Sequence, residues 1–233
     1  GDTSIDYKNR LPGNNLVVPT FNTLFSSSTW TSYMSDDFFG MMDANPSNGN
    51  DEGLMGPNEK VDVAFGRILA DDVTLANAMI DKVLNYEKQA SYGNWRNNIV
   101  MVSDDVDVDW EFNKLQVTLN ELSDRISQEK PFVNVKKIYM DAYEQQTSAG
   151  GNRYPDVNDA LKNDIEVGAL IINYFGHGGE DGLAKEFIYT KETATSLRNP
   201  NTLPMLVTVT CEFTKFDLPS RVTAGELTFW NKD

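Results

Sequence analysis

Two apolar stretches in the second half of the chain decide the fold that we expect. Residues 168–175 read GALIINYF and continue into GHGGEDG, and residues 205–210 read MLVTVT and continue into Cys211. The first stretch has no polar alternation, which is typical of a strand covered on both faces, and the second is another short apolar strand. We therefore predict two buried strands that run directly into His177 and Cys211.

Further strands alternate with helices on the N-terminal side of these two. The pattern predicts strands at 61–65, 99–102 and 133–139, and helices at about 71–90, 110–129, 156–164 and 190–198. This alternation indicates an α/β fold, a parallel sheet with helices on both faces.

Residues 1–60 are irregular and include a turn-rich loop around 43–53. A break at residues 92–94 leads us to expect a smaller N-terminal subdomain at 1–96 and a catalytic subdomain at 97–233. The chain ends at Asp233, shortly after the aromatic pair of residues 229–230 and without a helix stop signal, so we expect the second subdomain to be truncated at its C-terminus.

The amino-acid composition argues against several classes of function. The 233 residues include 20 basic and 35 acidic side chains, a net charge of −15, which disfavours binding to nucleic acid. There is one cysteine and one histidine, so an internal disulfide and a Cys/His-rich zinc site are both excluded.

The lone cysteine and the lone histidine form the strongest candidate site. His177 and Cys211 are 34 residues apart (211 − 177), a spacing that suits one strand–crossover–strand unit. Both would then lie at the carboxyl edge of the sheet, where such folds place their sites. A thiolate nucleophile, an imidazole and backbone amides of the glycine turn as an oxyanion hole make a cysteine peptidase or acyltransferase.

Three less specific interpretations stay open. A lone cysteine at a strand end is often buried and inert, and a lone histidine beside glycine is often a loop residue. The turn at 176–182 could also cradle a phosphate or sugar, although no lysine follows at Walker spacing.

Acidic residues alternate at 105–109, which reads DVDVD, and calcium prefers clustered carboxylates. The EF-hand pattern fails, because its sixth and twelfth places hold Trp110 and Gln116. We therefore expect a solvated strand end and helix N-terminus here. The acidic residues at 36–37 and 43–52 are a further possible calcium loop.

Several motifs resemble the gingipain family of cysteine peptidases, over roughly residues 33–230. The resembling segments are NYFGHG at 173–178, LPMLVTVTC at 203–211, FGRI at 65–68, the helix ending in NYE at 85–87, and SDDFFG at 35–40. Within the family, GGEDGLA at 178–184 and CEFTKFD at 211–217 are most similar to the sortases of type IX secretion systems.

The resemblance implies a caspase-like α/β fold preceded by a smaller related α/β subdomain. It implies a Cys211–His177 dyad and an oxyanion hole formed by the amides of Gly178 and Cys211. An acidic residue stands behind the histidine in this family, and Glu111 matches it, with Asp109 as a neighbouring candidate. Glu111 could equally be an ordinary acid in the first turn of a helix. No cofactor is implied, although structural calcium is possible.

The resemblance also implies a biological role. Such a sortase removes the C-terminal signal domain from cargo proteins at the outer-membrane surface and passes them to an amine of anionic lipopolysaccharide. Its partners would be the cargo, the lipopolysaccharide and other outer-membrane proteins of the secretion system. The alternative is a catalytically silent scaffold domain of the same assembly.

Overall fold

The computed structural model describes residues 20–22, 34–42, 60–217 and 221–233. The chain forms two compact units, residues 1–76 with 216–222, and residues 77–215 with 223–233. The expected boundary between residues 96 and 97 falls inside the second unit. The expected division of the chain into a non-catalytic and a catalytic subdomain stays a prediction. The turn-rich loop at 43–53 lies outside the described residues.

The first unit contains little regular structure in its described part. Strands β1 (Phe21–Asn22) and β2 (Met34–Ser35) pair antiparallel, and the 3-10 turn η1 (Asp37–Phe39) follows. Asp36 accepts two hydrogen bonds from the Arg67 guanidinium, at 2.7 and 2.6 Å. Asp36, one of the acidic residues considered for calcium, is therefore occupied by an ion pair.

The strand predicted at 61–65 is wrong. The amides of Asp62 and Val63 donate to one carbonyl, that of Gly40, at 2.9 and 3.2 Å. The Asp62 carboxylate accepts from the Met42 amide at 2.8 Å. This segment therefore forms a bend, because its backbone bonds to a turn and not to a neighbouring strand.

Helix α1 (Val73–Tyr86) begins where the sequence predicts and ends four residues earlier, before a 3-10 turn, η2 (Gln89–Ser91). The Asp72 carboxylate accepts from the Leu75 amide at 2.7 Å and so caps its N-terminus. The Lys82 ammonium donates to the carbonyls of Phe229 and Asn231, both at 2.9 Å, at the C-terminal end of helix α6 (Ala224–Trp230). Burial lowers the pKa of Lys82 to about 8.

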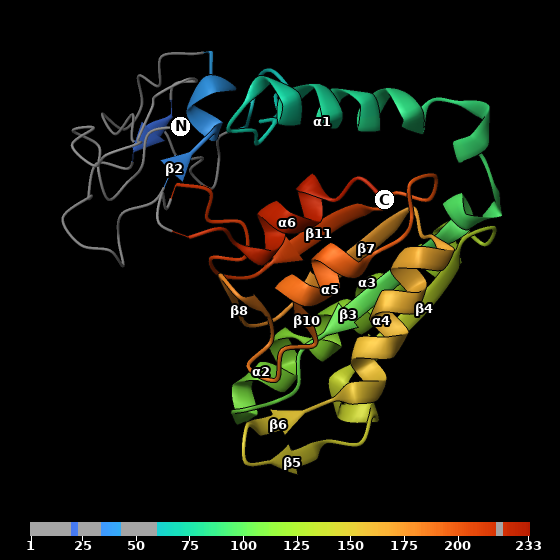
Figure 1. Ribbon diagram of the computed structural model, residues 1–233. Helices are drawn as coiled ribbons and strands as arrows, with labels where there is room; N and C mark the ends of the chain where they lie inside the picture. Colours follow the sequence, from blue (N-terminus) through green and yellow to red (C-terminus); the bar gives the residue numbers. More distant parts are fainter. Residues whose placement is uncertain (1–19, 23–33, 43–59, 218–220) are drawn as a thin grey trace. The chain divides into compact units, whose positions relative to one another are not determined.

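The second unit is built on a four-stranded sheet in the order β11-β7-β3-β4 (Figure 1). Its strands are β3 (Asn98–Ser103), β4 (Asn134–Tyr139), β7 (Ile171–Phe175) and β11 (Met205–Val209). All three neighbouring pairs are parallel, which confirms the expected sheet. β7 lies between β11 and β3, so it is covered on both edges as well as both faces.

Helices cover both faces of this sheet (Figure 1). α3 (Gln116–Glu129) places Leu119 against Met101 on one face. α4 (Pro155–Val167), α5 (Lys191–Ser196) and α6 lie on the other, where Leu161 packs in one buried cluster with Ile172 and Val102. The two clusters use alternate residues of the same strands, as the two-residue period of a strand requires.

Several details were not predicted. The helix expected at 110–129 is two helices, α2 (Asp109–Lys114) and α3, with the buried Leu115 between them. In the second unit helix α6 was also missed, and so were five short strands: β5 (Gln146–Ser148), β6 (Gly151–Arg153), β8 (Gly178–Gly179), β9 (Gly182–Leu183) and β10 (Tyr189–Thr190). Short strands have too few residues for a period to be recognised.

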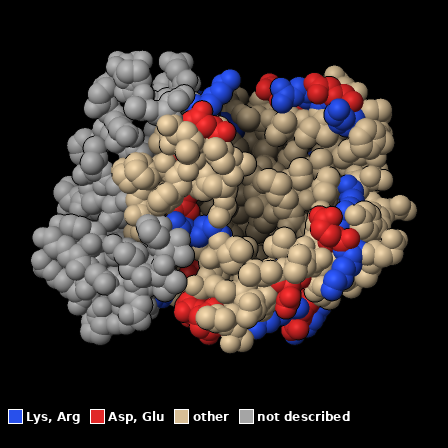
Figure 2. Space-filling view, turned by 90° about the horizontal axis from the view of Figure 1, so that it is seen from above, with Lys and Arg blue, Asp and Glu red and all other residues tan. Residues whose placement is uncertain are grey.

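None of the helices in the described part of the chain is both long and apolar enough to span a membrane. On the face drawn in Figure 2, basic and acidic side chains of the described residues gather in small groups of mixed sign. That face shows no continuous basic surface among the described residues, which agrees with the net charge of −15.

Candidate active site

His177 and Cys211 leave the sheet at equivalent points of two neighbouring strands. The last residue pair between β7 and β11 joins Phe175 to Val209, and each candidate residue lies two positions further along its strand. The Gly176 amide still donates to the Val209 carbonyl, at 3.3 Å. Neighbouring strands are about 4.8 Å apart, so the sequence prediction that both residues lie at one sheet edge is confirmed.

Glycines allow the histidine loop to pack closely on its neighbours. A Cβ atom at Gly176 would lie 2.7 Å from Asp104 Oδ2, and one at Gly178 would lie 3.2 Å from Thr210 Cγ2. Thr210 directly precedes Cys211. The loop that holds His177 therefore rests against the segment that presents the cysteine.

The backbone of His177 is fixed on both sides. Its amide donates to Asp104 Oδ2 at 2.6 Å. Its carbonyl accepts from the Tyr174 hydroxyl at 2.5 Å and from the Ala184 amide at 2.8 Å. The side chain stays 44% exposed, so the ring can reach a substrate while the backbone is held.

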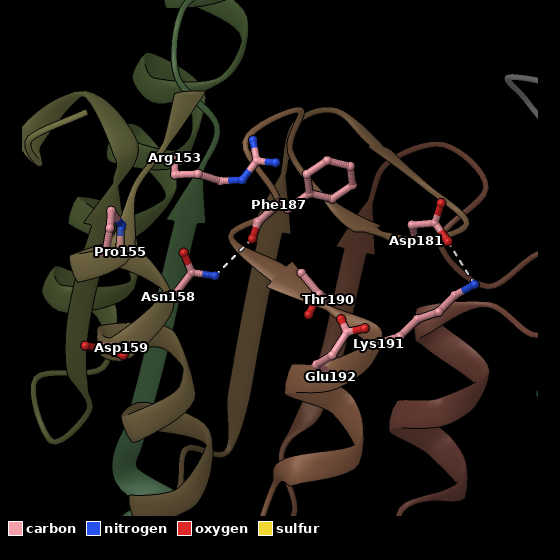
Figure 3. A pocket seen from close by; sticks show the side chains of 9 residues that line it. All are labelled: Arg153, Pro155, Asn158, Asp159, Asp181, Phe187, Thr190, Lys191 and Glu192. Atoms are coloured by element: carbon pink, nitrogen blue, oxygen red, sulfur yellow. Dashed lines mark hydrogen bonds and ion pairs between the residues drawn. The ribbon is translucent and has the colours of Figure 1, made fainter. Parts of the chain in front are cut away.

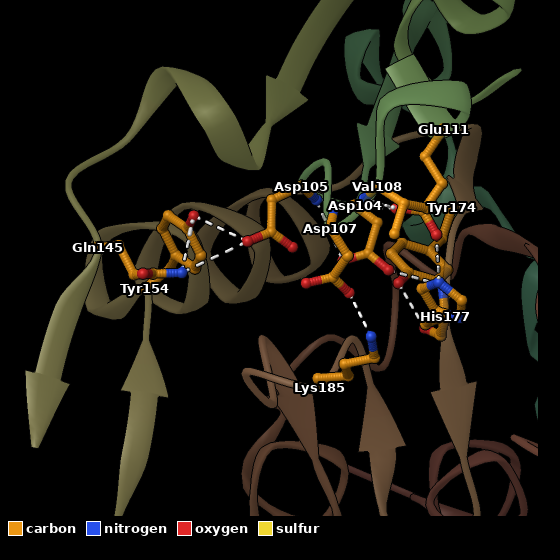
Figure 4. Close-up of polar contacts among 10 residues, drawn as sticks. All are labelled: Asp104, Asp105, Asp107, Val108, Glu111, Gln145, Tyr154, Tyr174, His177 and Lys185. Carbon is orange, nitrogen blue, oxygen red and sulfur yellow. Dashed lines mark hydrogen bonds and ion pairs between the residues drawn. The ribbon is translucent and has the colours of Figure 1, made fainter. Parts of the chain in front are cut away.

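The Glu111 carboxylate contacts the imidazole, as Figure 4 shows. Glu111 Oε1 lies 2.8 Å from His177 Nε2. Glu111 Oε2 accepts from the amides of Asp107 and Val108 at 2.8 and 3.0 Å, which caps the first turn of α2. The side chain is 3% exposed, and the hydrogen bond with His177 lowers the pKa of Glu111. One carboxylate thus serves as a helix cap and as the partner of the ring.

Asp109, the neighbouring candidate, is exposed, whereas Glu111 is buried against the ring. The structure therefore brings together His177 and Glu111, with Cys211 on the adjoining strand end. Asp104 is the residue that the sequence reasoning missed, although it directly follows β3 at the same sheet edge.

The expectation of a solvated strand end at 105–109 is wrong for Asp105, which is 7% exposed; Asp104, directly before it, is also buried, at 2% exposed. Burial raises the pKa of Asp104 to about 7, and the nearby Asp105 charge adds to this, against the opposing effect of the His177 amide. Only the later part of the acidic stretch, from Asp107, faces solvent.

Cys211 is exposed, and the residue after it has an unusual backbone. Glu212 has φ +52°, in the left-handed region, and its carbonyl accepts from the Lys215 amide at 3.2 Å. Such a conformation is costly for a non-glycine residue, and it turns the chain sharply away from the strand end. The interpretation of Cys211 as a buried thiol is therefore wrong, because the residue is exposed, and its reactivity stays a prediction.

A cavity of about 640 Å³ lies between α4, α5 and the β9–β10 region (Figure 3). Its lining residues are Arg153, Pro155, Asn158, Asp159, Asp181, Phe187, Thr190, Lys191 and Glu192. None of the candidate site residues lines it, so it is a feature separate from the histidine and cysteine.

A parallel sheet flanked by helices, with a cysteine and an acid-paired histidine at its carboxyl edge, defines the class of fold, a caspase-like α/β fold. The sequence profile of peptidase family C25 matches residues 1–233, and the chain belongs to that family.

Solved structures agree with the fold. The Arg-specific cysteine proteinase gingipain R (RgpB) matches with a TM-score of 0.62 and 16% identity, over 86% of this chain and 41% of that one. A complex of the Porphyromonas gingivalis RgpB pro- and mature domains matches with a TM-score of 0.53 and 17% identity, over 68% of this chain and 34% of that one. The chain thus spans well under half the length of these structures. A search of curated proteins found no match.

Proposed function

We propose that the protein is a cysteine endopeptidase in which Cys211 is the nucleophile and His177 the general base and acid. The observation that supports this most directly is the 2.8 Å contact between Glu111 and His177 Nε2, at a ring whose strand adjoins that of Cys211. Because Nε2 is occupied by the carboxylate, Nδ1 is the nitrogen left to exchange a proton with the thiol.

The reaction follows the usual order for a thiol nucleophile. Nδ1 takes the Cys211 proton, and the thiolate adds to the scissile carbonyl carbon. The amides of Gly178 and Cys211 serve as oxyanion donors. The imidazolium then protonates the leaving amine, which gives a thioester on Cys211 and a free N-terminus on the released fragment. All of these steps use groups of the chain itself, so no cofactor is needed.

Two local features support these roles. Among the described residues the Cys211 amide makes no hydrogen bond, so it is available to an oxyanion. Gly178 packs on the side chain of Thr210, the residue before Cys211, so its amide is near the cysteine segment.

The resemblance to type IX sortases leads us to propose a more specific role. The substrate is a cargo protein with a C-terminal signal domain, the thioester is passed to an amine of anionic lipopolysaccharide, and the enzyme acts at the cell surface with other outer-membrane proteins of the secretion system. Thioester chemistry fits this transfer, because an amine can replace water in the second step. The alternative is a catalytically silent scaffold of the same assembly.

Thiol labelling separates an enzyme from a scaffold. Cys211 is the only cysteine, so iodoacetamide incorporation measured by mass spectrometry reports on that residue alone. We expect rapid labelling in the wild type, at least about tenfold slower labelling in His177→Ala, and none in Cys211→Ala. Equal rates in the wild type and His177→Ala would contradict the dyad and favour the scaffold.

The sortase role is tested with a purified cargo that carries its C-terminal signal domain, incubated with the wild type or Cys211→Ala. Loss of the signal domain together with incorporation of an added fluorescent amine would support transfer. Cleavage without amine incorporation would support a simple peptidase, and an intact cargo would refute the proposed substrate.

A further inference from the structure

Three buried carboxylates gather behind the histidine loop. Asp104 and Asp105 come from the end of β3, and Glu186 comes from the turn after β9; we call them the acidic trio. Their exposed fractions are 2%, 7% and 7%. One carboxylate oxygen from each lies within 4.8 Å of the others.

Two oxygens of the acidic trio have no hydrogen-bond partner. Asp105 Oδ1 and Glu186 Oε2 are both inaccessible to solvent and unbonded. The other oxygen of Asp105 accepts from the Tyr154 hydroxyl at 3.0 Å and faces the Gln145 amide at 3.4 Å. A buried acceptor without a partner is costly, so these two oxygens point to a missing ligand.

No lysine or arginine in the described part of the chain forms an ion pair with the acidic trio. Lys185 directly precedes Glu186, but its ammonium is paired with Asp107 and its side chain is 59% exposed (Figure 4). Asp107 and Asp141 lie close enough to disfavour a charge on Asp105 further. Buried carboxylates are normally paired with a cation or bound to a metal.

We propose that the acidic trio binds a divalent cation, calcium. Calcium takes oxygen ligands at about 2.3–2.6 Å, so two oxygens on one ion are up to about 5 Å apart, which suits the spacing of the trio. The unpartnered oxygens of Asp105 and Glu186 would become ligands of the ion. Its two positive charges would offset two of the three carboxylate charges.

The other cluster of metal-ligating side chains does not fit this role. It consists of Asp107, Glu111 and His177. Asp107 already pairs with Lys185, and both Glu111 oxygens are already bonded, to the ring and to backbone amides. A cation there would break the contacts that hold the imidazole, so the acidic trio is the better site.

Calcium at the acidic trio would join the two sides of the histidine loop. Asp104 holds the His177 amide, and Ala184, two residues before Glu186, donates to the His177 carbonyl. An ion bound to Asp104 and Glu186 therefore fixes both anchors of His177. The binding itself does not depend on the proposed peptidase activity.

Calcium binding can be measured on the metal-free protein without a substrate. Terbium luminescence excited through tyrosine reports on this site, because Tyr154 is bonded to Asp105, and added calcium should displace the terbium. Calcium at about 100 times its dissociation constant should raise the unfolding temperature by about 5–10 °C, and the same concentration of magnesium should raise it less.

Glu186→Gln removes one charge with little change of shape, and Glu121→Gln is the matched control at an exposed position of α3. Calcium affinity should fall at least about tenfold in Glu186→Gln and stay unchanged in Glu121→Gln. Asp105→Asn, with the same expected loss, serves if Glu186→Gln does not fold. The proposal would be overturned if calcium left the unfolding temperature of the wild type unchanged. It would also be overturned if the wild type and all variants bound calcium with equal affinity. Slow thiol labelling with intact calcium binding would instead contradict only the proposed peptidase.

Discussion

Glu111→Gln tests whether the carboxylate behind the ring sets the state of the imidazole. The glutamine carbonyl can still accept from the amides of Asp107 and Val108, so the cap of α2 is kept. What changes is the contact at His177 Nε2. In the wild type the Glu111 carboxylate accepts a hydrogen bond there, whereas in the variant the glutamine NH₂ group donates one. The neutral ring would then carry its proton on Nδ1, the nitrogen that has to take the thiol proton.

The size of the effect follows from the lost interaction. A hydrogen bond to a charged group contributes about 1.5–3 kcal/mol, which corresponds to about a 10- to 150-fold change in a rate or population. Inverting the tautomer of a catalytic histidine costs up to about 10⁴-fold in a serine protease triad. We expect the rate of Cys211 alkylation to fall at least about tenfold in Glu111→Gln, and peptide cleavage to fall further.

The single histidine makes the tautomer directly measurable. A ¹⁵N–¹H spectrum of the imidazole contains only His177, and in the neutral ring it shows which nitrogen is protonated. We expect Nε2–H in the wild type and in the exposed control Asp109→Asn, and Nδ1–H in Glu111→Gln. A wild-type ring protonated on Nδ1, or Glu111→Gln labelled at the wild-type rate, would refute the reasoning.

Two further predictions concern stability, measured by denaturant unfolding of metal-free protein. The pKa of Asp104 is raised from 3.8 to about 7, so between these pH values the folded state holds a proton that the unfolded state has lost. The free energy of unfolding should therefore fall as the pH rises from about 4 to 7. Asp104→Asn should flatten this slope, and an unchanged slope would contradict the assignment to Asp104. The pKa of Lys82 is lowered from 10.5 to about 8, so between these pH values the unfolded state holds a proton that the folded state has lost. The free energy of unfolding should therefore rise from about pH 8 to 10.5, by at most about 3 kcal/mol, and Lys82→Met should lose this rise. A rise that persists in the variant would show that another group is responsible.

Three strands of the sheet, β3, β7 and β11, could be predicted because each is a short and mainly apolar run. The fourth, β4, contains two lysines and is largely exposed, so only its alternating apolar residues indicated a strand. The placement of His177 and Cys211 at one edge followed, since parallel neighbours end on the same side. The segment at 61–65 shows the limit of this reasoning. Its alternation suits a strand, but whether a neighbouring strand is present depends on the rest of the fold, and here Gly40 provides the hydrogen-bond acceptor.

The polar contacts of the site are harder to predict, because their partners are far apart in the sequence. Glu111 and His177 are 66 residues apart, and Asp104 and the His177 amide are 73 apart. The resemblance indicated Glu111, and its place in the first turn of a helix was apparent from the sequence. Nothing local indicates that Asp104 and Asp105 are buried while Asp107 is exposed, since all three belong to one acidic stretch.

The two carboxyl groups that hold His177 are driven in opposite directions by their surroundings. Glu111 accepts from two amides and the ring, and its pKa is lowered, so it stays charged and can accept a hydrogen bond from Nε2–H. Asp104 is buried beside another carboxylate, and its pKa is raised to about 7. A pair of acids separated in this way can take different roles at the same pH. Glu111 suits orientation of the imidazole, whereas Asp104, whose charge is costly unless a cation or a proton is present, suits control of the loop that carries it.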